Sequence, residues 1–207
     1  MSKSRAELRD AIIEVSLELG SELGEEGLTM RGIASRLGVS ATALYQHFES
    51  KSQILNEIRT YGVARLWGAM EPSLVISDFR ERMMGLVTSY VGFARENPWL
   101  YTVLMEHEEV NWDKVKEEDV TWALRPLFEL RKALEQGQRE GKVNPKTDVV
   151  TGSLQLWAAV HGLSSLLING RISEKHPMFP APDEKGLIQT FAKTLVRTVV
   201  DQRESAG

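Results

Sequence analysis

The chain has 207 residues, no cysteine, 42% hydrophobic residues and a formal net charge of −4. It is long enough for one large domain or two unequal ones, and we adopt the second interpretation. The lack of cysteine excludes disulfides, thiolate catalysis and cysteine-ligated metals. No apolar run reaches the roughly 18 residues that predict a membrane span, and residues 1–10 lack the apolar core of a signal peptide. We therefore expect a cytoplasmic protein without a membrane partner.

Residues 3–23 predict an amphipathic helix at the start of the chain. Apolar residues recur there at offsets of three and four, which is the spacing of one helix face. The residues expected to form core contacts are Leu8, Ile12, Val15, Leu19 and Leu23. Gly24 is expected to end this helix.

Residues 28–50 then predict two short helices separated by a tight turn. Thr29 can cap the first helix, and Gly38 can supply the left-handed residue that ends it. Ser40 can cap the second helix, which would begin at Ala41. The apolar residues expected on the inner faces are Met30, Ile33, Ala34 and Leu37 on the first helix and Leu44 and Phe48 on the second. This pattern predicts a helix-turn-helix, although such helix pairs also occur in proteins that do not bind DNA.

The side chains expected on the outer surface of the predicted second helix are small or polar. Its outward residues are Thr42, Ala43, Gln46 and His47, with Tyr45 at the boundary. Side chains of this kind suit entry into the major groove of DNA. Ser50 can cap a third helix at Lys51, whose ammonium and neighbouring backbone N–H groups would suit a phosphate.

The rest of the chain predicts further helices and no strand, so the expected fold class is all-α. A long helix from Lys51 should reach about residue 70, where Glu71-Pro72 is expected to stop it. Because no flexible segment precedes this helix, we expect it to act as a lever between the DNA unit and the remainder. The other expected helices cover 78–96, 98–105, 120–140, 147–169 and 183–202, with charged irregular sequence at 106–119 and a loop at 170–182.

The helix-turn-helix segment resembles the tetracycline-repressor (TetR) family of bacterial regulators. The matching residues are Thr29, Arg31, Ile33, Ala34, Leu37, Gly38, Val39 and Ser40, followed by Leu44, Tyr45, His47, Phe48 and Lys51. Gly32 departs from the pattern, because family members usually carry a side chain there. The resemblance implies a three-helix DNA-binding domain over residues 1–50 and a helical ligand-binding and dimerisation domain over 51–207, with the helix from Lys51 shared.

The same resemblance implies a division of roles on DNA. Thr42, Ala43 and Gln46 would face base edges at the start of a recognition helix that opens at Ala41. The implied phosphate anchors are Thr29, Arg31, Ser40, Tyr45, His47 and Lys51. The implied function is that of a ligand-responsive repressor that binds a palindromic double-stranded operator as a homodimer, without a cofactor.

The net charge of the N-terminal segment does not favour nucleic acid. Residues 1–60 carry seven Lys and Arg against nine Asp and Glu, which gives −2. The prediction of DNA binding therefore depends on where the cations lie, because cations gathered on one surface can still face phosphates. The cations that can be gathered are Lys3, Arg5, Arg9, Arg31, Arg36 and Lys51.

The C-terminal half carries a weaker resemblance to one common type within this family, a W-x-x-x-H-G signature formed by Trp157, His161 and Gly162 together with Ala94–Pro98, Leu100 and Tyr101. The two last predicted helices are the best candidates for a dimer interface, with small residues at Ala158, Gly162 and Ser165 and packing within one subunit as the alternative.

The resemblance also implies a pocket among the middle helices for a small, mostly apolar effector of unknown identity. Candidate wall residues are Trp67, Met70, Met84, Leu86, Tyr90, Phe93, Leu104, Met105, Trp122, Phe128, Trp157 and His161. Apolar residues at helical spacing are also what any core requires, so each of them has a purely structural alternative.

Two other classes of function stay open. The Glu106-His107-Glu108-Glu109 cluster could supply ligands of a metal-dependent helical enzyme, but the chain has no H-E-x-x-H, no G-x-S-x-G and no phosphate loop. We therefore expect neither catalysis nor a metal site. The second alternative is a helical module whose N-terminal unit binds protein instead of DNA.

Overall fold

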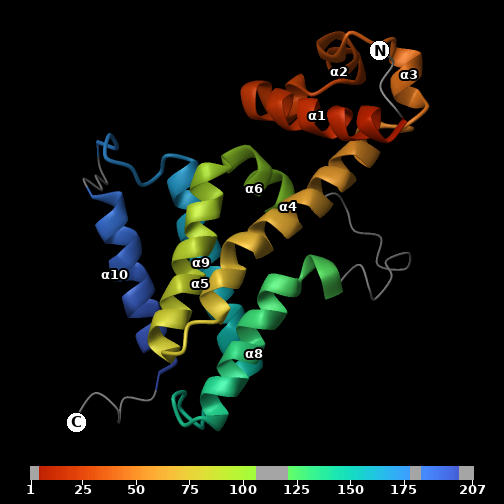
Figure 1. Ribbon diagram of the computed structural model, residues 1–207. Coiled ribbons are helices and arrows are strands. Elements are labelled where there is room, and N and C mark those ends of the chain that lie inside the picture. Colours follow the sequence, from red (N-terminus) through yellow and green to blue (C-terminus); the bar gives the residue numbers. More distant parts are fainter. Residues whose placement is uncertain (1–4, 106–120, 178–182, 201–207) are drawn as a thin grey trace. The chain divides into compact units, whose positions relative to one another are not determined.

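The computed structural model describes residues 5–105, 121–177 and 183–200 (Figure 1). The described residues are helical except for loops and isolated bridge residues, among them Val143 paired with Val200, so the all-α prediction is confirmed. The helices are α1 Arg5–Gly27, α2 Met30–Leu37, α3 Ala41–Tyr45, α4 Lys51–Leu74, α5 Phe79–Glu96, α6 Pro98–Met105, α8 Arg125–Arg139, α9 Val149–Ile168 and α10 Glu184–Arg197.

The chain forms two compact units. The first contains residues 1–64 and 97–110, and the second contains residues 65–96 and 111–207. Helix α4 therefore begins in the first unit and ends in the second, and the chain returns to the first unit between Glu96 and Asn97. A division after residue 50 stays a sequence-based interpretation. The spatial grouping places half of α4 and all of α6 with the helix-turn-helix.

The first unit packs α1, α2, α3, α6 and the start of α4 around a continuous apolar core. Its most deeply buried side chains are Ile12, Leu28, Ile33, Leu44, Phe48, Ile54 and Ile58, all 0% exposed. Two glycines allow close helix contacts: a Cβ on Gly20 of α1 would overlap the Trp99 ring of α6, and a Cβ on Gly62 of α4 would lie 2.9 Å from Leu100 and Leu104. Helix α6 is thus a structural part of the DNA-binding half of the chain.

Two details of α1 and α4 differ from the sequence predictions. Leu23 is 58% exposed and not a core residue, because the backbone leaves helical geometry at Gly24 (φ 72°) and the last residues of α1 follow a new direction. Helix α4 does not stop at Glu71-Pro72 but continues to Leu74. Pro72 lies in its last turn, where a helix can tolerate the missing N–H and the bend that proline imposes.

The second unit surrounds α5, which contacts α8, α9 and α10. Each helix start is fixed locally. Asp78 accepts a hydrogen bond from the Glu81 N–H (2.8 Å) ahead of α5, Asp148 and Asp183 cap α9 and α10, and Pro126 lies in the first turn of α8. Helix α10 ends at Arg197, earlier than the predicted residue 202. Val200, which follows it, forms an antiparallel bridge with Val143.

Candidate functional site

Helix α2 and the turn after it have the geometry that the sequence predicts. The Thr29 hydroxyl accepts a hydrogen bond from the Gly32 N–H (3.0 Å), which caps the helix. Gly38 is left-handed (φ 68°), and the Val39 N–H reaches the Ala34 carbonyl (3.0 Å). The turn is therefore fixed by one side-chain cap and one glycine.

Helix α3 exposes one polar face and buries the other. The Ser40 hydroxyl caps it by accepting a hydrogen bond from the Ala43 N–H (3.1 Å). Leu44 and Phe48 are fully buried, whereas Thr42, Tyr45 and Gln46 are exposed. Ala41, Ala43 and His47 are half-buried, so the predicted DNA-facing residues come together on one accessible surface. The regular helix ends at Tyr45, and Gln46 and His47 lie in the turn that follows it.

Arg9 of α1 joins three parts of the first unit behind this surface. Its guanidinium lies 4.4 Å above the Phe48 ring, donates to the His47 carbonyl (3.4 Å) and pairs with Glu57 of α4 (2.6 Å). These contacts of Arg9 hold the end of the recognition segment against α1 and α4. The sequence predicts Arg9 among the cations that can be gathered on one surface, but no local pattern indicates this contact at a separation of 38 residues.

Two other predicted surface cations also have partners within the chain. Arg36 pairs with Glu22 (2.7 Å), and this hydrogen bond, followed by the opposite charge, lowers the pKa of the Glu22 carboxyl. Lys51 donates to the Glu25 carbonyl (2.6 Å) and lies 3.8 Å from the Glu25 carboxylate. Arg31 is exposed, Lys3 falls outside the described residues, and Arg5 is described only through its backbone. The start of α4 is further capped by Ser50, which accepts from the Gln53 N–H (3.3 Å).

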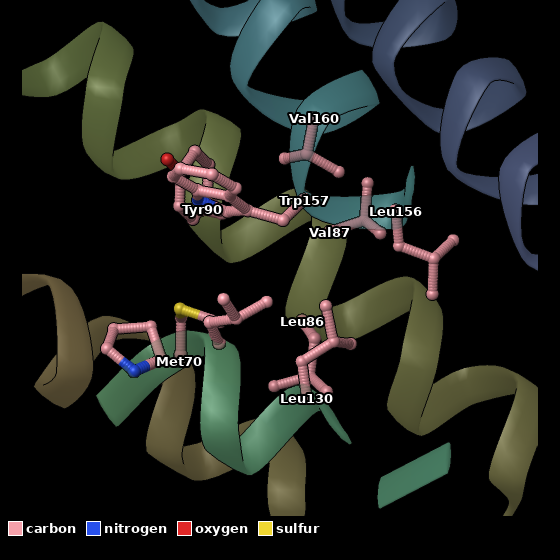
Figure 2. Close-up of a pocket in the computed structure, with 10 residues that line it drawn as sticks. Met70, Leu86, Val87, Tyr90, Leu130, Leu156, Trp157 and Val160 are labelled. Carbon is pink, nitrogen blue, oxygen red and sulfur yellow. The ribbon is translucent and has the colours of Figure 1, made fainter. Parts of the chain in front are cut away.

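The second unit contains an apolar cavity of about 30 Å³ (Figure 2). It is lined by residues of α4, α5, α8 and α9: Met70, Leu86, Val87, Tyr90, Pro126, Leu127, Leu130, Leu156, Trp157 and Val160. Figure 2 shows the Tyr90 and Trp157 side chains at one end and those of Leu86 and Leu130 at the other. None of the lining residues carries a charge.

The cavity includes some of the predicted pocket residues and not others. Met70, Leu86, Tyr90 and Trp157 line it. Phe93 is buried, and Met84, Trp122 and Phe128 are half-buried, but none of these four lines the cavity. Trp67 lies under the Arg125 guanidinium (4.1 Å), and Met105 and Leu104 belong to the first unit. The walls that sequence reasoning missed, Val87, Pro126, Leu127, Leu130, Leu156 and Val160, are aliphatic residues that a search for Met and aromatic residues passes over.

His161 lies one turn beyond Trp157, with their ring centroids 6.0 Å apart. Burial lowers the pKa of the His161 imidazole. The neutral form is therefore favoured at neutral pH.

Helix α9 also presents an apolar outer face. Val150, Leu154 and Leu166 are 41%, 45% and 44% exposed, and Ala158 on the same helix is exposed as well. No Asp, Glu, Lys or Arg occurs between residues 149 and 168. Val150, Leu154 and Ala158 follow one another at four-residue spacing, whereas Leu166 lies farther around the helix. Exposed apolar side chains with no charge among them are typical of a surface that another protein surface covers.

Two kinds of feature are absent from the described part of the chain. It contains no group of three or more His, Asp or Glu side chains placed to hold a metal ion, and no helix long and apolar enough to cross a membrane. The Glu106-His107-Glu108-Glu109 cluster falls outside the described residues.

Comparison with known proteins identifies both halves of the chain. The profile described as bacterial regulatory proteins of the tetR family matches residues 12–58, and that of the tetracyclin repressor-like C-terminal domain matches residues 83–185. Tetracycline repressor protein class C from Escherichia coli is 48% identical over 50 residues, which are 24% of this chain and only 23% of that protein. Nucleoid occlusion factor SlmA from Marinobacter nauticus is 24% identical over 164 residues, covering 78% of this chain and 84% of the relative.

A similar fold occurs in a solved structure of a putative transcriptional regulator from Saccharomonospora viridis in complex with choline. That structure superposes with a TM-score of 0.76 at 22% identity and covers 96% of this chain and 100% of the other. At this identity the likeness concerns the fold alone.

Proposed function

The chain belongs to the TetR family of bacterial DNA-binding transcriptional regulators, and from this premise we propose that it is a ligand-responsive repressor that binds a palindromic operator as a homodimer. The observation that supports the proposal most directly is the exposed polar face of α3, held over the buried Leu44 and Phe48. The family consists of transcriptional regulators, and we propose no catalytic activity. A cytoplasmic location belongs to the same proposal.

Sequence reading is assigned to the exposed residues of the α3 segment. Gln46 can form a bidentate hydrogen-bond pair with adenine, and the methyl groups of Thr42 and Ala43 can contact a thymine methyl. The surrounding phosphate contacts are assigned to Thr29, Arg31, Ser40, Tyr45, His47 and Lys51, as the resemblance implies. Because Lys51 already bonds to Glu25, its contact with DNA would exchange a partner within the protein for a phosphate.

Dimerisation is assigned to the outer face of α9 together with α10. Two copies related by a twofold axis would form a four-helix bundle in which Val150, Leu154 and Leu166 are covered. The same axis would relate two recognition segments. These must then match major grooves about 34 Å apart, or a multiple of that distance, on a palindromic site.

Effector response is assigned to the apolar cavity. Met70, which lines it, lies on α4, the helix that begins beside the DNA-reading segment at Lys51. A ligand that binds better to one position of α4 than to another would change the DNA affinity by that difference. The solved structure from S. viridis is a complex with choline, so a protein of this fold can hold a small molecule.

The proposal is tested by selecting bound sequences from a random DNA pool with the purified protein. We expect a palindromic motif with two half-sites, bound by a dimer, with an affinity that falls steeply as salt increases. Failure to enrich any sequence, with or without added ligand, would contradict DNA reading and favour a protein-interaction module.

Two neighbouring substitutions then test the division of roles. Tyr45→Ala should weaken binding to all sequences to a similar extent, whereas Gln46→Ala should change the base preference at one position of each half-site. Selection with both variants measures this directly. The opposite pattern would contradict the assignment of Tyr45 to phosphate and Gln46 to a base.

A further inference from the structure

The walls of the cavity differ from those of most binding pockets in that they offer no charged group. Met70 comes from α4, Leu86 and Tyr90 from α5, Leu130 from α8 and Trp157 from α9, and the remaining walls are also apolar. Pockets that bind charged ligands place an opposite charge or converging polar groups among their apolar walls. In this cavity the Tyr90 side chain is the one lining group with a hydroxyl.

We propose that this cavity binds a compact, uncharged aromatic molecule and excludes anions and quaternary ammonium ions of similar shape. The inference depends on the proposed function only in assigning the cavity an effector role. Binding and its selectivity can be measured without DNA.

The selectivity follows from desolvation. An ion that enters an apolar cavity loses its hydration, and this loss is not compensated unless the site supplies a charge or several hydrogen bonds. The buried cation on α5, Arg82, supplies neither a charge nor a hydrogen bond to the cavity, because it does not line it. Its guanidinium instead donates to the Ser77 carbonyl (3.2 Å) and to Gln136 Oε1 (3.4 Å). A carboxylate would therefore enter without a partner.

The preference for a ring follows from the aromatic end of the cavity. Tyr90 and Trp157 present aromatic surface there (Figure 2), and aromatic pairs are favoured beyond the area that they bury. A quaternary ammonium could also contact ring faces. However, most of the lining residues are aliphatic and would leave the rest of that cation desolvated without compensation.

The size of the ligand is limited by the walls. A cavity of about 30 Å³ is small for a binding site, so even one ring requires side chains to move. Met70 can do this, because its thioether chain has several rotatable bonds and adapts to irregular contacts. We therefore expect one ring with a short neutral substituent rather than an extended molecule.

The test uses three probes of similar size and different charge: acetophenone, benzoate and benzyltrimethylammonium. Titration calorimetry and thermal unfolding of the full chain at pH 7.5 should show that acetophenone binds and raises the melting temperature. The affinities of the two ions should be at least tenfold lower. Benzoate or the quaternary ammonium binding as tightly as acetophenone would overturn the inference, as would the failure of acetophenone to bind.

Two substitutions at one position locate the binding. Leu130→Phe should fill the cavity and reduce acetophenone affinity at least tenfold. Leu130→Ala should enlarge it, so that the two-ring ketone 2-acetonaphthone gains affinity relative to acetophenone. Unchanged affinities in both variants would show that binding occurs elsewhere and would overturn the inference. Operator selection without ligand is independent of these results, so failure of the cavity assignment and failure of DNA reading remain distinguishable.

Discussion

The two units of this protein differ in how their charged and apolar side chains are distributed. In the DNA-reading unit, Arg9, Arg36 and Lys51 each contact a carboxylate of their own chain, and these pairs join α1 to α2 and to α4. In the second unit, α9 carries no Asp, Glu, Lys or Arg, and the buried Arg82 has no carboxylate partner among the described residues. The second unit also contains an ion pair between helices, Arg95 of α5 with Glu184 of α10. Its difference from the first unit is therefore the uncharged α9, which lines the cavity and exposes apolar side chains.

The largest expected effect is on the free energy of unfolding, and it is tested by substituting one leucine in each unit. Leu44→Ala removes a fully buried side chain under the recognition face and should lower the free energy of unfolding by about 2–5 kcal/mol. Leu154→Ala removes a side chain that is 45% exposed in the single chain. Its effect should appear in association instead, as a dimer that dissociates at higher protein concentration. Urea unfolding and sedimentation measure the two quantities. A concentration-independent loss of stability in Leu154→Ala would contradict the assignment of α9 to the dimer interface.

The next effect concerns the charge buried in the second unit. Arg82 is 7% exposed, and its Nε atom has no hydrogen-bond partner. Arg82→Met keeps much of the volume and removes the desolvated charge, so we expect stability to increase by about 1 kcal/mol. Gln136 and Ser77, which accept its hydrogen bonds, are exposed and can bond to water instead. Thermal unfolding of both proteins gives the difference, and a clear destabilisation would show that Arg82 contributes an interaction beyond these contacts.

A helix cap in the DNA-reading unit should have an effect of similar or smaller size. Ser40→Ala removes the hydroxyl that accepts from the Ala43 N–H, and we expect a loss of about 1 kcal/mol in the free energy of unfolding. Ser40→Asp serves as the matched control because aspartate also caps, although its charge should weaken binding to DNA. If Ser40→Ala and Ser40→Asp were equally destabilised, the cap would not be the source of the effect.

The smallest effect is the pH dependence of the second unit. Burial lowers the pKa of His161, so the unfolded chain binds a proton there more readily than the folded protein does. As the pH falls through the usual imidazole value of about 6.5, this residue should therefore reduce stability, by less than about 1 kcal/mol because it is only half-buried. Urea-unfolding midpoints of the parent protein and of His161→Gln, each at pH 7.5 and 5.5, measure the contribution of His161 to the pH dependence of stability. An identical pH dependence in both would contradict the prediction.

What could be predicted from the sequence follows the same division between the units. Helix starts were predictable where one residue decides them locally, as at Thr29, Ser40 and Pro98, whereas α8 begins at Arg125 and not at the predicted residue 120. The direction of the chain after Gly24 was not, because the exposure of Leu23 depends on a kink whose size no spacing rule gives. Proline at position 72 was overinterpreted, since its effect depends on how close it lies to a helix end.

The candidate site was predictable to unequal degrees. The exposed face of α3 follows from helical spacing within a few residues, and the structure brings those side chains onto one surface. The cavity forms where helices far apart in the sequence meet, so its lining residues could not be predicted from local sequence patterns. In the sequence, Leu130 and Val160 resemble ordinary core residues. The packing of α8 and α9 against α5 is what makes them part of the cavity wall. The same reason explains why the contacts of Arg9 with His47, Phe48 and Glu57 could not be predicted.

The contact between Gly20 and Trp99 has a consequence for protein engineering. The simplest exchange of the DNA-reading module with that of another regulator is one cut in the chain, for example within α4. Here such a cut would remove Trp99, Leu100 and Leu104, and the faces of α1 and α4 at Gly20 and Gly62 would lose the helix that covers them. A transplanted reader should therefore include residues 97–105 as a second inserted segment, so a functional chimaera of this protein requires two grafts and not one.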